Sequence, residues 1–202
     1  MAIDFKKTKL DGHFPEIWRG AAKMLPGGFK PVQNFPVGTV LRRATLLYVD
    51  FANKTAAVCK SAKVLTGGTT QKVRVNKGTH FAVGDVITKA GDGKATPNIS
   101  SIDTTNAEYD ELNLSAAYAG LAAGDVIVES QAPAGGNGDA TPLYTPNAIV
   151  GAEKEFDGKG LPTIDAAYEA VVLYPAVAYA LVPEWMQGIC LKSNPNLVFI
   201  EQ

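Results

Sequence analysis

The sequence has few of the residues from which most active sites are built. Its 202 residues include only two histidines, His13 and His80, and two cysteines, Cys59 and Cys190. Neither histidine has a partner at the spacing of a metal site or a catalytic triad, so both are interpreted as turn or surface residues. The cysteines lie in strand-like runs, which favours free thiols over a disulfide. We therefore expect a protein that is not an enzyme, with no catalytic residues, no cofactor and no metal.

Charge is also scarce. Charged residues make up 19% of the chain, and the formal net charge is −1 without any basic block, which argues against nucleic acid as a partner. No apolar run approaches the ~20 residues of a membrane-spanning helix, and no apolar segment follows the N-terminal lysines as it would in a secretory signal. We expect no membrane partner. A low surface charge instead indicates contact with other subunits.

What the sequence does have is one seven-residue phrase that occurs three times, at 35–41, 81–87 and 121–127. Each copy contains a large apolar residue, a small apolar residue, glycine, Thr or Asp, valine, and then Leu or Ile. Glycine followed by Asp or Thr is typical of a tight turn, and the branched residues after it are typical of a strand. Duplication and convergent turn chemistry both explain the three copies. The predicted turn residues are Gly38, Gly84, Asp85, Gly124 and Asp125.

The two turn aspartates have a second interpretation, as a pair of carboxylates for acid–base chemistry. Thr39 occupies the matching place in the first copy and cannot do that work. The pattern therefore favours a structural role in the turns for Asp85 and Asp125.

Outside these phrases the chain has the pattern of a β protein. Ten or more short runs of strand-forming residues are separated by Gly, Asn and Pro turns, which predicts a mainly β fold, a small barrel or sandwich. Residues 166–174 are compatible with helix or strand, and their β-branched residues favour strand. Proline and glycine frame a one-turn helix at 183–188. The predicted hairpins pair 46–50 with 56–60, 99–103 with 109–114, and 189–192 with 197–201.

The predicted domain organisation has two parts. Residues 1–34 form an N-terminal arm for attachment or exchange, because prolines and glycines interrupt a region that is nevertheless rich in large apolar side chains. The alternative is an arm that packs back on its own domain. Residues 35–202 form the β domain, with a long irregular loop at 130–147. The expected arm contacts are Phe14, Trp18, Leu25 and Phe29.

Three segments resemble one known family. They read Phe81-Ala-Val-Gly-Asp-Val-Ile-Thr-Lys, Ser101-Ile-Asp-Thr-Thr-Asn-Ala-Glu-Tyr-Asp and Leu121-Ala-Ala-Gly-Asp-Val-Ile-Val-Glu. Together with the apolar, proline-broken arm and the closing hairpin, they resemble the head fibre or capsid decoration proteins of tailed phages and prophages, of the Bacteroidales type. The likeness spans about residues 35–202.

The resemblance implies a non-enzymatic virion structural protein, made in the bacterial host cytoplasm. It implies a homotrimer that binds the major capsid protein on the outer surface of the capsid. Two alternatives remain at this stage. One is a β module that binds carbohydrate or a cell surface, with Tyr144 or Trp185 as a stacking platform. The other is an enzyme or assembly factor with an unusual site.

Overall fold

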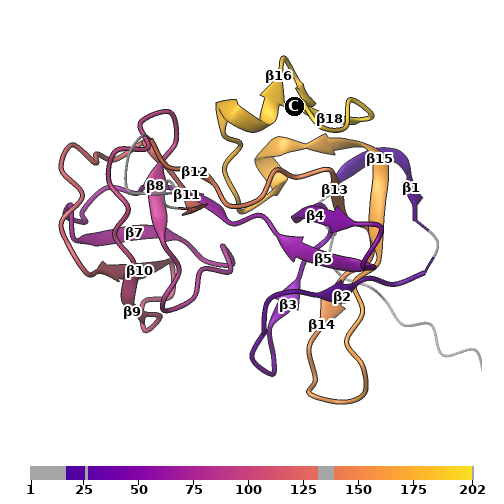
Figure 1. The fold of residues 1–202 in the computed structure, drawn as a ribbon, viewed down its shortest axis with the longest axis horizontal. Helices are drawn as coiled ribbons and strands as arrows, with labels where there is room; N and C mark the ends of the chain where they lie inside the picture. Colours follow the sequence, from indigo (N-terminus) through magenta and orange to yellow (C-terminus); the bar gives the residue numbers. More distant parts are fainter. Residues whose placement is uncertain (1–16, 26, 132–138, 202) are drawn as a thin grey trace, which may run out of the picture.

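The chain builds two β lobes, which lie side by side in Figure 1. The computed structural model describes residues 17–25, 27–131 and 139–201. The described residues within 17–60 and 143–201 form the main lobe, and those within 61–142 form an inserted lobe between them. The chain therefore crosses between the lobes twice, once on the way out and once on the way back.

The main lobe is organised by a nine-stranded sheet that curls into a half-barrel. The strands follow the order β16-β17-β18-β15-β13-β4-β5-β2, and β1 also pairs with β15. A separate ribbon joins β3 and β14. The strands are β1 Trp18–Met24, β2 Lys30–Pro31, β3 Val40–Leu41, β4 Leu46–Asp50, β5 Thr55–Val58, β13 Ala148–Val150, β14 Lys154–Glu155, β15 Ala166–Leu173, β16 Met186–Gln187, β17 Cys190–Leu191 and β18 Leu197–Ile200. The 3₁₀ turns are η2 Tyr174–Ala176 and η3 Pro183–Trp185.

The inserted lobe contains two smaller sheets. One has the order β7-β10-β9, and the other places β11 between β6, β8 and β12. In β7, Val73 and Val75 are buried while Lys72 and Asn76 are exposed, which is the alternation expected of a strand with one wet face. The strands are β6 Ser61–Lys63, β7 Lys72–Asn76, β8 Ile87–Lys89, β9 Ile99–Asp103, β10 Tyr109–Leu114, β11 Val126–Gln131 and β12 Thr141–Pro142.

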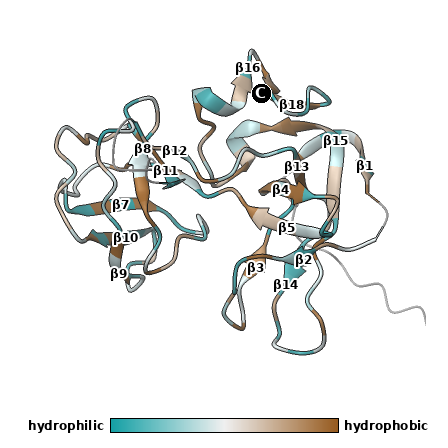
Figure 2. Cartoon of the chain, viewed as in Figure 1, coloured by the Kyte–Doolittle hydropathy of each residue, from teal (hydrophilic) through white to brown (hydrophobic). Residues whose placement is uncertain are grey.

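Three clusters of buried apolar side chains hold the fold together. Two lie in the main lobe, where hydrophobic strands such as β4 and β13 stand out in Figure 2. The third fills the inserted lobe and includes Ile87, Leu112 and Tyr118. Val128 on β11 of the inserted lobe belongs to a main-lobe cluster together with Trp185. The lobes are therefore packed together through an apolar junction, which is what the hydrophobic effect favours where two sheets meet.

The structure confirms the mainly β prediction and most of its elements. The three predicted hairpins are present as β4–β5, β9–β10 and β17–β18. The ambiguous segment is the strand β15, and the one-turn helix is η3. Both cysteines are free thiols, with Cys59 buried and Cys190 half-buried.

The predicted division between an arm and a domain after residue 34 is not a boundary in this fold. Strand β1 pairs with β15, and β2 runs parallel to β5, so both belong to the nine-stranded sheet. Phe29 is 6% exposed within a core cluster, and Leu25 packs against the same cluster. The arm therefore packs back on its own domain over the described part of its length. Phe14 lies outside the described residues.

The loop predicted at 130–147 is interrupted by structure. Ser130 and Gln131 extend β11, where they pair with Pro142 and Thr141 of β12. The sequence pattern missed this ladder because β12 is only two residues long and contains a proline, a residue that strands tolerate only at edges. Residues 132–138 lie outside the described part of the chain.

Candidate functional site

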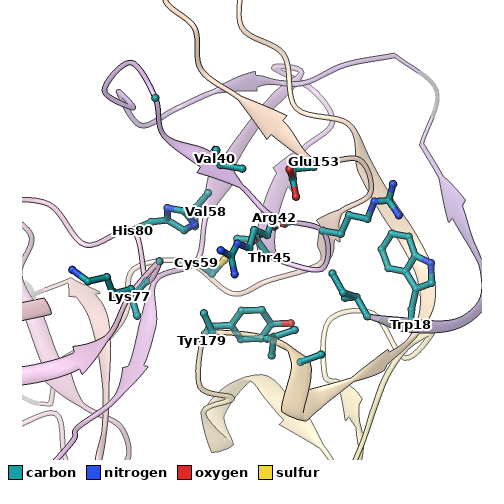
Figure 3. A pocket seen from close by; sticks show the side chains of 18 of the residues that line it. Trp18, Val40, Arg42, Thr45, Val58, Cys59, Lys77, His80, Glu153 and Tyr179 are labelled. Atoms are coloured by element: carbon teal, nitrogen blue, oxygen red, sulfur yellow. Dashed lines mark hydrogen bonds between the residues drawn. The ribbon is translucent and has the colours of Figure 1, made fainter. Parts of the chain in front are cut away.

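A groove of about 1270 Å³ opens between the two lobes. In Figure 3, Lys77 and His80 approach it from the inserted lobe, and Trp18 closes the opposite side. Arg42 and Tyr179 lie between them, on the main lobe. The groove is thus built from segments far apart in the sequence, which is why no local pattern predicted it.

The groove carries more positive than negative charge. Arg42, Arg43 and Lys77 line it together with a single carboxylate, Glu153. Arg43 lies over the Trp18 ring at 5.9 Å, which is a cation–π geometry. Lys77 is already bound to Asp110 at 2.7 Å. No hydrogen bond or ion pair joins the side chain of Arg42 to another described residue, and its positive charge acts on His80.

His80 contributes no charge to the groove near neutral pH. Burial, and then the positive charges of Lys60 and Arg42, lower the pKa of its imidazole to about 4. Its φ of 62° places it in a left-handed turn conformation. The prediction of a turn histidine is confirmed, and its ring packs edge-on against Phe35 at 6.2 Å.

The three repeated phrases fold into the same turn. Gly38, Gly84 and Gly124 have φ of 88°, 96° and 95°, and the next residue donates its backbone N–H to the carbonyl three positions back at 3.0–3.1 Å. Each glycine N–H donates to a carbonyl of a neighbouring segment at 2.8 Å. Strand β3, the bridge at Val86 followed by β8, and strand β11 begin directly afterwards. The predicted turn role of these glycines is confirmed.

The turn aspartates stabilise their own turns. Asp85 Oδ2 accepts the backbone N–H of Ala82 at 2.7 Å, and Asp125 Oδ2 accepts that of Ala122 at 2.8 Å. Each aspartate also binds one lysine. Asp125 pairs with Lys89 at 2.8 Å, and Asp85 pairs with Lys60 at 2.7 Å. The two aspartates therefore serve different lysines and do not act as one carboxylate pair.

The Lys60 site is the most deeply buried group of charges in the described structure. The Lys60 side chain is 4% exposed, and its Nζ donates to Asp85 Oδ2 at 2.7 Å and to Glu129 Oε1 at 3.2 Å. Burial is the main reason that the pKa of Glu129 rises to about 7, and Asp85 raises it further while Lys60 opposes the shift. Glu129 Oε2 has no hydrogen-bond partner.

Sequence reasoning missed Lys60, Glu129 and Arg42. Lys60 and Glu129 are 69 positions apart, and they meet only because β11 runs beside the segment that contains Lys60. One signal was available: Glu129 follows Val126-Ile-Val, so a strand places a carboxylate in an otherwise apolar run. Buried carboxylates of this kind need a partner.

The aromatic residues proposed as a stacking platform lie in different surroundings. Trp185 is 1% exposed and belongs to the core, so it cannot stack on a ligand. Tyr144 stacks on Tyr48, with ring centroids 5.7 Å apart, and Tyr48 is 37% exposed. Tyr179 lines the groove and donates its hydroxyl to the carbonyl of Ala44 at 2.8 Å.

Two classes of site are not seen in the described residues. Within 17–25, 27–131 and 139–201, no three His, Cys, Asp or Glu side chains are grouped to hold a metal ion. No helix in the same ranges is both long and apolar enough to cross a membrane.

No protein-family model, curated protein or solved structure matches this chain.

Proposed function

We propose that this protein is a non-enzymatic virion structural protein, a head fibre or decoration protein that binds the outer surface of a phage capsid. The observation that carries the proposal is a pair of loops on the main lobe whose tips expose large apolar side chains. Leu161 is 91% exposed and Val37 is 74% exposed. Exposed apolar side chains gathered at one place mark surfaces that bind another protein.

The two loops are held together as one unit, which we call the double tip (residues 36–39 and 157–161). Strands β3 and β14 pair at its base. Gly38 donates its N–H to the carbonyl of Phe156 at 2.8 Å, and Phe156 donates back to Thr39 at 2.9 Å. A Cβ on Gly158 would lie 2.9 Å from Val37 Cγ2, so the second loop packs directly on the first. A preorganised tip loses little conformational entropy on binding.

We also propose an oligomeric state, a partner and a location for this protein. Three copies of the chain form a homotrimer, each double tip contacts the major capsid protein, and the mature protein resides in the virion after synthesis in the bacterial cytoplasm. A capsid repeats each site many times, so three weak contacts joined in one trimer give strong attachment. The low charge content of the chain supports subunit contact.

Cosedimentation with purified phage capsids tests this function. Val37→Asp is compared with Val83→Asp, which changes the same position of the repeated turn on the inserted lobe, where Val83 is 63% exposed. We expect Val37→Asp to weaken capsid binding by about tenfold or more, because burying one such side chain contributes ~1.5–3 kcal/mol. Val83→Asp should bind like wild type. A wild-type protein that ignores capsids contradicts the proposal, and a monomeric mass in solution contradicts the trimer.

A second candidate function is carbohydrate binding, and the stacked pair of Tyr48 and Tyr144 favours it. A half-exposed aromatic face is a common platform for sugar rings, because it offers flat apolar area at low entropic cost. Glycan-array binding that is lost in Tyr48→Ala, by a protein that does not bind capsids, would favour this candidate over the first.

A further inference from the structure

The segment that joins the two lobes carries a buried lysine flanked by two carboxylates. Lys60 lies between β5 of the main lobe and β6 of the inserted lobe, Asp85 ends the second repeated turn, and Glu129 lies on β11. Their side chains are 4%, 12% and 10% exposed. Asp85 Oδ2 accepts two short hydrogen bonds of 2.7 Å, one from Lys60 Nζ and one from the backbone N–H of Ala82.

Backbone hydrogen bonds hold the three residues in place. Glu129 donates its N–H to the carbonyl of Lys60 at 3.0 Å. The next residue, Ser130, donates to the carbonyl of Val86, beside Asp85, at 2.8 Å. Strand β11 thus clamps the lysine on one side and the aspartate on the other. A reacting pair held in this way is close and oriented, which is the condition under which intramolecular reactions are fast.

A plain ion pair does not explain this arrangement. One buried lysine balances one carboxylate, but here there are two, and Glu129 Oε2 has no hydrogen-bond partner. Burying an ion without a full set of partners is costly, so a second carboxylate beside a single lysine needs an explanation. The raised pKa of Glu129, about 7, agrees with a carboxyl group that keeps its proton near neutral pH.

We propose that Lys60 and Asp85 become joined by an intramolecular amide bond, with Glu129 as the group that transfers protons during its formation. The bond would connect the linker between the lobes to the second repeated turn. It makes this buried cluster a site of self-modification and does not depend on the proposed function.

The reaction balances without any other reactant. Lys60 gives a proton to Asp85, so that a neutral amine faces a neutral carboxylic acid. The lone pair of Nζ attacks Cγ, the C–N bond forms, and the π electrons of the carbonyl move onto oxygen. Glu129 accepts a proton from the nitrogen and delivers its own proton to the departing oxygen of Asp85. The C–O bond breaks, one water leaves, and Glu129 is again a neutral acid.

The turn orients the carboxyl group for attack. The backbone N–H of Ala82 donates to Asp85 Oδ2 at 2.7 Å, the same oxygen that Lys60 Nζ contacts, so it holds this oxygen in place and polarises the carboxyl group. Glu129 contacts the nucleophile directly, through Oε1 to Lys60 Nζ at 3.2 Å, and the charge of Asp85 is close enough to raise the pKa of Glu129. The proton-transfer group therefore lies beside both reactants.

The third repeated turn provides a natural control. Asp125 binds Ala122 N–H and Lys89 Nζ in the same way that Asp85 binds Ala82 and Lys60. The side chains of Lys89 and Asp125 are 27% and 23% exposed, so water keeps both ionised. The pKa of Asp125 is lowered, first by the hydrogen bond from Lys89, and that of Lys89 is raised by the same bond. A charged amine is not a nucleophile, so no amide forms there.

The mass of the full chain after denaturation tests the proposal. Wild type should be lighter than its sequence by one water molecule. Lys60→Met, Asp85→Ala and Glu129→Gln should each have the full mass expected of their sequences. Lys89→Met and Asp125→Asn should still lack one water. Digestion of wild type should release a branched peptide in which Lys60 is joined to Asp85.

Glu129→Gln keeps the lysine, the aspartate and the shape of the third side chain, so it separates chemistry from folding. Its circular dichroism should match that of wild type. Wild type at its full sequence mass, after long incubation in the folded state, overturns the proposal. A missing water without the branched peptide also overturns it, because a single aspartate can lose water within its own backbone. A Glu129→Gln protein that forms the branched peptide overturns the role of Glu129.

Discussion

The second and third repeated turns are built alike and differ in what surrounds them. Both place glycine at positive φ, aspartate on a backbone N–H, and a lysine on that aspartate. At the third turn the side chains of Lys89 and Asp125 are 27% and 23% exposed to water. At the second turn the side chains of Lys60 and Asp85 are 4% and 12% exposed, and a third group, Glu129, is added. Burial, and not the local sequence, decides what the same pair of residues does.

Removal of each lysine should give the largest contrast between the two turns. Lys60→Met leaves two buried carboxylates without a cation, which costs about 3–5 kcal/mol of unfolding free energy. Where the amide bond has formed, the variant also loses a covalent closure between positions 25 apart. Lys89→Met should stay close to wild type, since exposed ion pairs contribute little. Urea unfolding measures the free energy of unfolding of both variants. Equal losses of stability would contradict the conclusion that the two lysines differ in burial.

The turns and the strands that follow them were predictable from the sequence. Glycine before Asp or Thr, followed by branched residues, is enough to predict a turn and a strand, because both depend on the φ preference of glycine and on side-chain shape. All three turns are present as predicted. The prediction of hairpins succeeded for the same reason, since their strands are neighbours in sequence.

Replacing the turn glycines should show that the backbone of the three copies is equivalent. Each of Gly38, Gly84 and Gly124 has open space where a Cβ would lie, so only the positive φ is penalised. Alanine at each position should cost about 1–2 kcal/mol. Asparagine, which tolerates this conformation better, is the matched control and should cost less. Thermal unfolding of the six variants measures this, and a much larger cost at one glycine would show that its turn is constrained differently.

The contacts between segments that are far apart in the sequence were not predictable. The sheet of the main lobe accepts β1 and β2 from the region predicted as an arm, because β15 and β5 have free edges that no local pattern shows. The division into two lobes depends on where β11 pairs, and so does the meeting of Lys60 with Glu129. The sequence around a turn aspartate is the same whether the lysine that binds it is buried or exposed to solvent. Only the packing of the lobes separates the two cases.

The two turns should also differ in how the free energy of unfolding responds to pH. Burial raises the pKa of Glu129 from 4.5 to about 7, so between these values the folded chain binds a proton that the unfolded chain has lost. The free energy of unfolding should therefore fall as pH rises from about 4.5 to about 7. Glu129→Gln cannot titrate and is the control, so the difference between wild type and this variant isolates the contribution of Glu129.

Asp125 should produce the opposite slope at lower pH. Its pKa is lowered from 3.8, first by the hydrogen bond from Lys89, so it stabilises the fold above its ordinary pKa and this contribution is lost as pH falls through the folded value. The difference between wild type and Asp125→Asn, followed by urea unfolding in acid, isolates this term. Since the Lys89 pair is open to solvent, salt should weaken its effect, whereas the Glu129 slope should change little because buried groups are poorly screened. If both slopes had the same sign, the two turns would not differ in burial in the way that the structure shows.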